Sequence, residues 1–214
     1  MDYRYIVVEG AIGSGKSELA RRLAEYFNAL YLTESPERNP FLEKLYLNPA
    51  AHGLAAELYF LMRRAEAVNI INFEENRPEG RVVADFLLEK DRIFAPVLLH
   101  GNEPANEQAL FWQIKHKVMP EIPVPDLVVY LQTSDACAVR RLQAKQDSSF
   151  CLFPKGYLEQ INEEYRRFFH LYQNSPLLIA DADDMDFAGN DDHFEILLRA
   201  ISHMQGSRYH LNSG

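Results

Sequence analysis

The sequence predicts an α/β fold in three layers, in which a five-stranded parallel sheet is flanked by helices. Two patterns support this prediction: short apolar runs alternate with longer amphipathic segments, and the first run leads into a glycine-rich turn. The predicted strands cover residues 5–9, 30–33, 81–85, 127–132 and 177–180. Helical periodicity covers residues 16–28, 40–47, 54–75, 107–119, 135–145, 156–173 and 191–204. This alternation favours a parallel sheet covered on both faces.

The domain organisation follows from length and local composition. A chain of 214 residues that is 47% hydrophobic can bury a full core, and we expect one domain over residues 1–205. Residues 146–154 have weak periodicity between two predicted helices, so we interpret them as part of a lid that spans about 141–153. The tail at 206–214 is rich in Gly, Ser, Asn and His and is expected to be loosely ordered.

Composition excludes several classes of function. The formal net charge is −9, from 22 Lys and Arg against 31 Asp and Glu. Such a surface argues against a nucleic-acid polymer as partner, because phosphate binding needs clustered cations, although one local cationic pocket is still allowed. Cys137 and Cys151 lack metal-ligand spacing, and no apolar run approaches the roughly 20 residues of a membrane span. A strand begins almost at the first residue and leaves no room for a signal peptide, so we expect a cytoplasmic protein with no membrane partner.

A phosphate-binding loop follows the first predicted strand. The motif G-x-x-x-x-G-K-[ST] is matched by Gly10, Ala11, Ile12, Gly13, Ser14, Gly15, Lys16 and Ser17. Its glycines let backbone N–H groups turn toward a phosphate, and the following helix adds the partial positive charge of its N-terminus. Lys16 is expected to bridge the β- and γ-phosphates, and the Ser17 hydroxyl to bind Mg²⁺. The motif predicts binding of a nucleoside triphosphate but says little about the acceptor.

Three predicted strands end at carboxylates, Glu9, Glu34 and Asp85. Ligands of an open parallel sheet bind beyond these carboxyl ends. Glu34 could take a proton from an acceptor hydroxyl or help to hold Mg²⁺, whereas Glu9, at the loop entrance, could be structural. Asp85 ends an apolar strand, as does the aspartate that holds the metal in many phosphate-loop enzymes. The alternative is that these carboxylates cap the helices that follow.

Six segments of the chain together resemble a known family. They read IVVEGAIGSGKSELARRLAE, TESPERNPFLEKLYLNP, VVADFLLEKDRIFA, DLVVYLQ, GYLEQINEEYRRFF and PLLIADADDMDF. In this order they resemble the bacterial deoxynucleoside kinases of the deoxyadenosine/deoxyguanosine kinase type over nearly the whole chain. The resemblance implies the phosphate-loop (P-loop) kinase fold with a short lid, ATP as phosphate donor with Mg²⁺, a deoxynucleoside as acceptor, and a homodimer.

The resemblance also implies roles for single residues. Glu34 matches the carboxylate that accepts the proton of the 5′-hydroxyl, and Arg141 matches the first cation of the lid. Matches in the substrate site are Tyr46 for the sugar 3′-hydroxyl, Arg64 for the base, Phe94 for stacking on the base, and Asp85 for the acidic motif after the third strand. Asp186 and Phe187 resemble the loop that contacts the adenine of the donor.

The chain departs from the family pattern in the lid and in the base site. The family's acid–arginine pair reads Asp85-Phe86 here. Lys145 can replace a lid arginine only as a point charge. Asp147 occupies a position where a cation is expected, and Phe150 one where a sugar-reading glutamate is expected. Glu57 replaces the glutamine that reads the base edge, and a carboxylate accepts hydrogen bonds but cannot donate them.

Three functions are consistent with these residues. The first is ATP-dependent phosphorylation of a deoxynucleoside 5′-hydroxyl for nucleotide salvage, with Glu34 as base, Lys16 and Arg141 stabilising the transferred group, and Ser17 with Asp85 holding Mg²⁺. The second is a nucleoside monophosphate kinase of the thymidylate kinase sort, for which Arg63, Arg64 and Arg92 could bind the acceptor phosphate. The third is a degenerate nucleotide-binding homologue with little activity. The lid motivates it, because it lacks arginines that the family usually has, and an arginine clamp contributes a factor of about 10³–10⁵ to the rate of phosphoryl transfer.

Overall fold

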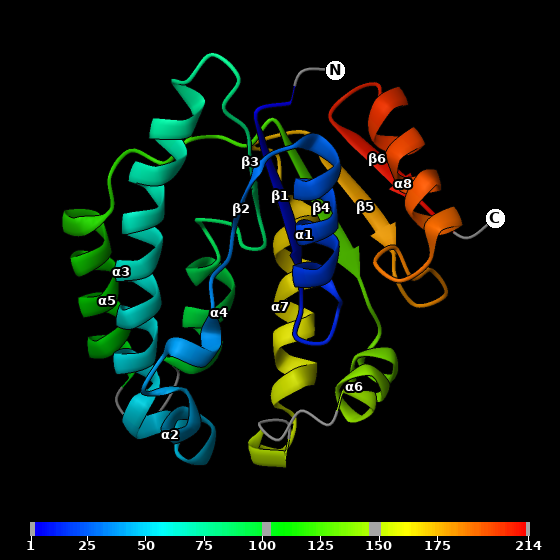
Figure 1. The fold of residues 1–214 in the computed structure, drawn as a ribbon. Coiled ribbons are helices and arrows are strands. Elements are labelled where there is room, and N and C mark those ends of the chain that lie inside the picture. The colour runs from blue at the N-terminus through cyan, green and yellow to red at the C-terminus, as the bar shows by residue number, and fades with distance from the viewer. Residues whose placement is uncertain (1–2, 100–103, 146–150, 213–214) are drawn as a thin grey trace.

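A single parallel sheet organises the computed structural model, which describes residues 3–99, 104–145 and 151–212 (Figure 1). Its strands are β1 (Tyr5–Gly10), β2 (Leu30–Leu32), β3 (Val82–Ala84), β4 (Leu127–Gln132), β5 (Leu177–Asp181) and β6 (Arg208–Leu211). They lie in the order β2-β3-β1-β4-β5-β6, and each pair of neighbours is parallel. The predicted α/β class is therefore confirmed, but the sheet has six strands and not five.

The additional strand, β6, lies in the tail that we expected to be loosely ordered. It pairs with β5 along its whole length, from Leu177 opposite Arg208 to Ala180 opposite Leu211. Of its four residues only Leu211 is buried, and it packs into the core on one face of the sheet. The prediction of a loose tail is wrong for these residues because an edge strand with one buried side chain has almost no hydrophobic pattern.

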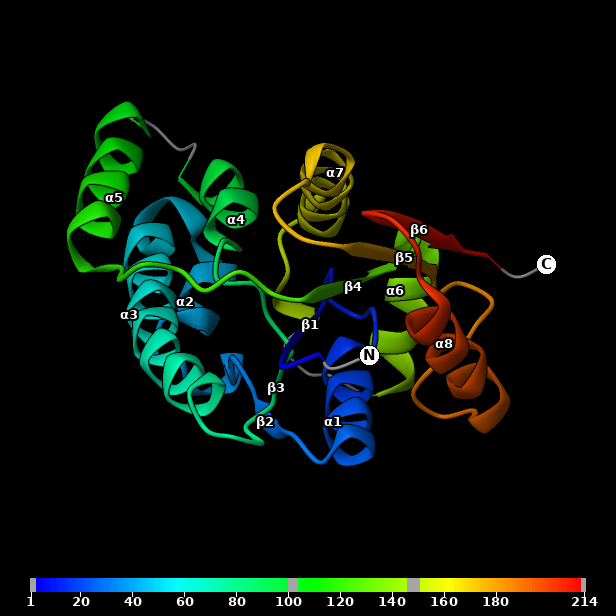
Figure 2. The same cartoon turned by 90° about the horizontal axis from the view of Figure 1, so that it is seen from above.

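Helices cover both faces of the sheet (Figure 2). They are α1 (Lys16–Phe27), α2 (Leu42–Leu47), α3 (Pro49–Glu75), α4 (Asp91–Leu98), α5 (Pro104–Val118), α6 (Asp135–Ala144), α7 (Tyr157–Leu171) and α8 (Asp191–His203), with a short 3₁₀ turn at Pro36–Arg38. Helices α1 and α8 lie on one face, α4 and α7 lie on the other, and α3 with α5 stands farther out beside α4. In the described part of the chain, no helix is long and apolar enough to cross a membrane.

The core is divided in two by the sheet because successive strand residues point to opposite faces. Tyr5 and Val7 pack with α3, α4 and α7, whereas Ile6 and Val8 pack with α1 and α8. All six residues of β1 are buried, as expected for a central strand covered on both faces.

The sequence prediction missed α4 and placed the start of α3 too late. Pro96 lies inside α4, where proline normally interrupts the helical pattern. Helix α3 begins at Pro49, directly after Asn48, whose side chain accepts a hydrogen bond from the backbone N–H of Ala51 at 3.3 Å. Asparagine as cap followed by proline is a common start of a helix.

The strand order places a ligand site at the end of β1. The chain passes from β1 to β2 and β3 on one side, and then to β4 on the other. Open parallel sheets bind ligands where the order reverses in this way. At that point Gly13 and Gly15 have φ angles of 84° and 89°, a left-handed conformation that other residues rarely adopt. The sheet therefore presents the glycine-rich loop at its switch point.

Candidate active site

One cavity of about 1340 Å³ lies beyond the carboxyl ends of the strands. It brings together nearly all the residues that the sequence assigned to a site: Ile12, Gly13, Ser14, Gly15, Lys16, Ser17, Glu34, Tyr46, Glu57, Arg64, Asp85, Phe94, Arg141, Asp186 and Phe187. Gly10 and Ala11 are buried at the base of the loop and are absent from this lining. The cavity thus joins the phosphate loop to the expected acceptor site.

The phosphate loop leads directly into α1. The backbone N–H of Ser14 donates to the Ala11 carbonyl at 3.1 Å, and Gly15 caps the helix in a left-handed conformation. Burial and the nearby Lys90 lower the pKa of Lys16, while carboxylates at the strand ends act in the opposite direction. A helix N-terminus beside a lysine is a suitable site for phosphate groups.

Glu34 is held between two cations. Its Oε1 accepts from Nη1 of Arg64 at 2.8 Å, and its Oε2 accepts from Nζ of Lys90 at 2.6 Å. The three side chains are nearly buried. Burial alone would raise the pKa of Glu34, but Lys90 and Arg64 outweigh it and hold that pKa below its usual range. The carboxylate is therefore ionised near neutral pH.

Lys90 is a site residue that the sequence analysis missed. It lies directly before α4, and its Nζ is also 3.9 Å from Oε1 of Glu9. Phe86, where the family has an arginine, is buried in the core and supplies no charge. The ammonium group of Lys90, four residues later, lies beside the Glu34 carboxylate. In the sequence, the one hint was a lysine four residues after the position where the family has an arginine. That hint does not reveal the contact between Lys90 and Glu34.

Glu9 has a structural role. Its Oε1 accepts from the backbone N–H of Gly10 at 3.0 Å and from the Tyr165 hydroxyl at 2.9 Å, and its Oε2 accepts from the backbone N–H of Leu87 at 2.7 Å. The side chain is completely buried. It ties β1, α7 and the segment after β3 together beneath the site.

Asp85 supports the end of β2. Its Oδ2 accepts from the hydroxyls of Tyr31 at 2.7 Å and Thr33 at 3.1 Å, and its Oδ1 accepts from the backbone N–H of Glu34 at 2.9 Å. These bonds fix the backbone that carries Glu34. The alternative role, in which the Asp85 carboxylate caps the next helix, is not seen in the described residues, because α4 begins after Lys90.

Ser17 and Asp85 both line the cavity. Tyr31, which donates to Asp85, also lies within hydrogen-bonding reach of Ser17. Mg²⁺ commonly takes one or two protein oxygens and completes its shell with phosphate oxygens and water. A hydroxyl and a carboxylate beside a phosphate loop fit that requirement.

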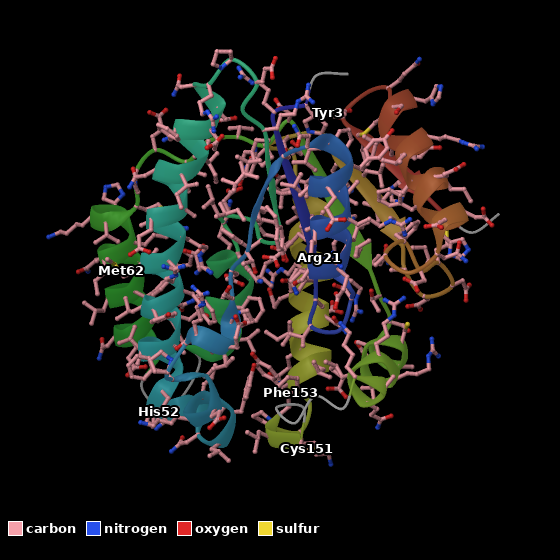
Figure 3. All side chains as sticks on the ribbon, viewed as in Figure 1. Tyr3, Arg21, His52, Met62, Cys151 and Phe153 are labelled. Atoms are coloured by element: carbon pink, nitrogen blue, oxygen red, sulfur yellow. The ribbon has the colours of Figure 1, made fainter. Side chains whose placement is uncertain are left out.

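The acceptor side of the cavity is largely aromatic. Tyr46 packs against Phe153 and Tyr157, with ring centroids 4.5 and 5.9 Å apart. Figure 3 shows Phe153 in the segment that precedes α7, close to Cys151 and at the same end of the molecule as His52 of α3. Phe94 also lines the cavity, and Lys90 Nζ lies 5.4 Å from its ring centroid. Flat apolar walls of this kind are suited to a planar heterocycle.

Arg141 reaches the phosphate loop from α6. It donates to the backbone carbonyl of Ser14 at 2.9 Å and to that of Ala182. Lys145 is exposed and pairs with Glu18. The predicted lid positions Asp147 and Phe150 lie outside the described residues.

Asp186 and Phe187 lie at the donor end of the cavity. The Asp186 carboxylate accepts from the backbone N–H groups of Ala188 and Gly189 at 3.2 and 2.9 Å, which shapes a tight loop before α8. The Phe187 side chain is buried in the core beside that helix. The loop therefore has a fixed shape where it meets the cavity.

Comparisons with known proteins agree with this geometry. The family model described as "Deoxynucleoside kinase" matches residues 6–204. The chain belongs to the deoxynucleoside kinase family. As a member of this family it is a phosphotransferase that phosphorylates a deoxynucleoside.

Similar curated proteins share about a quarter of their residues with the chain. It is 26% identical to a deoxyguanosine kinase of Bacillus subtilis (strain 168), over 89% of the chain and 92% of that protein. It is 25% identical to a deoxyadenosine kinase of Lactobacillus acidophilus, over 92% of the chain and 94% of that protein. A solved deoxyadenosine kinase from M. mycoides with bound dATP has the same fold, with a TM-score of 0.78, 21% identity, and coverage of 92% of this chain and 99% of that one.

Proposed function

We propose that this protein transfers the γ-phosphoryl group of ATP to the 5′-hydroxyl of a deoxynucleoside, giving a deoxynucleoside 5′-monophosphate. The observation that carries the proposal is the ionised Glu34 carboxylate, which shares one cavity with the phosphate loop. In the transfer, the hydroxyl oxygen bonds to the γ-phosphorus as the bond to the β,γ-bridging oxygen breaks. The hydroxyl proton passes to Glu34. Such reactions depend mainly on positioning and charge neutralisation.

The chain's cations would neutralise the transferred group. Lys16 would contact the β- and γ-phosphates, and Arg141, beside the loop backbone, would add a second positive charge. Ser17 and Asp85 would hold Mg²⁺, which supplies charge neutralisation at the phosphate oxygens when bound. Tyr46 would bind the sugar, Phe94 would stack on the base, and the loop at Asp186 and Phe187 would contact the donor base.

A nucleoside monophosphate kinase of the thymidylate kinase sort is a weaker alternative. Its acceptor carries a phosphate and would need cations at the sugar site. Arg63 pairs with Glu66 at 2.7 Å, and Arg92 pairs with Glu89 at 3.3 Å. Arg92 is exposed and Arg63 half-buried, and neither is among the residues that line the cavity. Arg64 is already paired with Glu34. Because each of these arginines is paired with a carboxylate, the charges favour an acceptor without a phosphate group.

We also propose a cytoplasmic homodimer. Support comes from exposed apolar side chains on the outer helices, namely Met62, Ile70 and Phe73 of α3 and Leu110 of α5. Light scattering after gel filtration would give a mass near twice 24.7 kDa, whereas a mass of one chain would contradict the dimer.

An assay with defined acceptors tests the proposed reaction. The protein with Mg·ATP is offered the four deoxynucleosides and, separately, their 5′-monophosphates. Monophosphate formed from a nucleoside supports the proposal, diphosphate formed from a monophosphate supports the alternative, and ATP binding without either product indicates a degenerate homologue.

Glu34→Gln tests the base. The change should lower kcat by at least about 10²-fold, the low end of general-base contributions, and leave ATP affinity near that of the wild type. Glu121→Gln, on an exposed loop, is the matched control. Retained activity in Glu34→Gln would show that another group takes the proton.

A further inference from the structure

Arg22 joins helix α1 to the loop that follows β5. Its Nη1 donates to the backbone carbonyl of Ala188 at 2.9 Å and, in a longer contact of 3.4 Å, to that of Asn190. Its Nη2 pairs with the carboxylate of Asp191, the first residue of α8. Its Cζ lies 4.0 Å from the ring centroid of Phe194, also on α8. One guanidinium group therefore contacts both the loop and the helix after it.

The same loop, residues 186–190, is held from its other side by α8. Nδ1 of His193 accepts a hydrogen bond from the backbone N–H of Asp186 at 2.9 Å. The Asp186 carboxylate fills the space where a side chain on Gly189 would stand, since a Cβ there would lie 2.5 Å from Oδ2. The Phe187 side chain is buried in the core. The shape of the loop therefore depends on side chains from two helices.

Arg22 and the loop form one wall of the cavity. Arg22, Ala188 and Gly189 are all among its lining residues. Helix α1 begins at Lys16 of the phosphate loop, and Arg22 lies about 9 Å farther along it, at 1.5 Å per residue. Helices α1 and α8 lie on the same face of the sheet (Figure 2). A nucleotide whose phosphates lie at the start of α1 would extend its sugar and base along this wall.

We infer that Arg22 is a positioning residue for the phosphate donor, which fixes residues 186–190 in the shape that receives the donor base. This role rests on the proposed function, in which the loop contacts that base, and adds the side chain that holds the loop in place. Arg22 acts through the backbone carbonyls of Ala188 and Asn190 and not on the reacting atoms. A loop that is already ordered lowers the entropy that binding would otherwise cost.

Arginine is suited to this task because its planar group carries several N–H donors and can stack on an aromatic ring at the same time. Two other roles for Arg22 make different predictions. If Arg22 only joined α1 to α8 for stability, its loss would lower the melting temperature and leave ligand affinities unchanged. If it supported the phosphate loop through α1, its loss would weaken every phosphate ligand equally.

Inorganic tripolyphosphate separates these roles, because it keeps the phosphates of ATP and lacks the sugar and base. Titration calorimetry with Mg²⁺ gives the ratio of Kd for tripolyphosphate to Kd for ATP in the wild type, Arg22→Met and Arg199→Met. Arg199 is the matched control, since it is exposed on α8, pairs with Glu195 and does not line the cavity. The ratio should fall by at least about 5-fold in Arg22→Met, the cost of reordering about one loop residue, and stay within about 2-fold in the control.

A smaller fall of this ratio in folded Arg22→Met would overturn the role of Arg22. If circular dichroism shows that Arg22→Met is unfolded, Arg22→Lys is measured against the same threshold, because one ammonium group cannot bond both carbonyls and lie flat on the Phe194 ring. In the kinase assay, KM for ATP should rise while kcat at saturating ATP stays within about 2-fold. A lower kcat at an unchanged KM would also overturn the role.

The binding measurement needs neither an acceptor nor turnover, so it separates the two levels of inference. If no deoxynucleoside is phosphorylated, the proposed function fails, and the ratio of the two dissociation constants still tests whether Arg22 positions the loop for the base of ATP. If deoxynucleosides are phosphorylated and the ratio does not change in Arg22→Met, the proposed function stands and the role of Arg22 fails.

Discussion

Replacing Lys90 by methionine should move the pH dependence of the kinase reaction. Lys90 donates a charge-assisted hydrogen bond to Glu34 at 2.6 Å, and both groups are nearly buried. Such a bond contributes about 1.5–3 kcal/mol. One pKa unit corresponds to 1.36 kcal/mol, so its loss should raise the pKa of Glu34 by about 1–2 units. Nη1 of Arg64, 2.8 Å from Oε1 of Glu34, still balances part of the negative charge of the carboxylate in this variant.

The sign follows from the form that accepts the proton. Glu34 works as a base only when ionised, so a higher pKa removes activity at the acidic end first. The acidic limb of the kcat/KM profile should therefore move up by about 1–2 pH units in Lys90→Met, and activity at pH 8 should be closer to that of the wild type.

The assay is the profile of kcat/KM against pH from about 3.5 to 9, so that it includes the acidic limb of the wild type, recorded beside a thermal melt of each variant. Lys90→Arg keeps the charge and should move the limb by less than about 0.5 units. Lys117→Met, an exposed lysine on α5, controls for the loss of net charge. If the limb of folded Lys90→Met coincides with that of the wild type, Lys90 does not set the ionisation of Glu34.

Two further predictions concern the lid helix and the sheet edge. Arg141→Ala should lower kcat by about 10³-fold or more. The matched variant Arg140→Ala should stay near the wild type, because Arg140 is exposed and its described hydrogen bond goes to Cys137 Sγ. Equal losses in the two variants would refute a specific role for Arg141. Leu211→Ala should lower the free energy of unfolding by about 2–3 kcal/mol and the melting temperature by about 4–10 °C, because Leu211 is buried in β6. The control His210→Ala removes an exposed side chain of the same strand and should change the melting temperature by less than about 2 °C. Calorimetry on both variants measures this difference, and an unchanged melt for Leu211→Ala would mean that β6 adds no stability.

Local sequence signals were sufficient for the centre of the fold. The phosphate loop combines a strict motif with a strand before it and an amphipathic helix after it, and all three features are visible within residues 5–27. Glu34 and Asp85 could be placed because parallel strands bring their carboxyl ends to one edge. Sequence patterns that involve one strand or helix and its neighbour along the chain therefore predicted these features correctly.

Features that depend on long-range contacts were not predictable. Lys90 is 56 residues from Glu34, and no periodicity links a lysine at the start of one helix to a carboxylate after β2. Asp85 was interpreted as a metal ligand, and nothing local showed that Tyr31 and Thr33 would donate to it. The edge strand β6 offers one buried residue, too little for a pattern of period two.

The position of Arg64 has a consequence for redesign of substrate preference. Its guanidinium group binds the Glu34 carboxylate through Nη1, and Arg64 is also among the residues that line the cavity. A substitution at Arg64 therefore changes recognition and reactivity together, and kcat and KM cannot be adjusted separately there. Glu57 does not contact Glu34 directly in any described hydrogen bond or ion pair. Libraries that seek new acceptors should vary Glu57 and its apolar neighbours while Arg64 is kept.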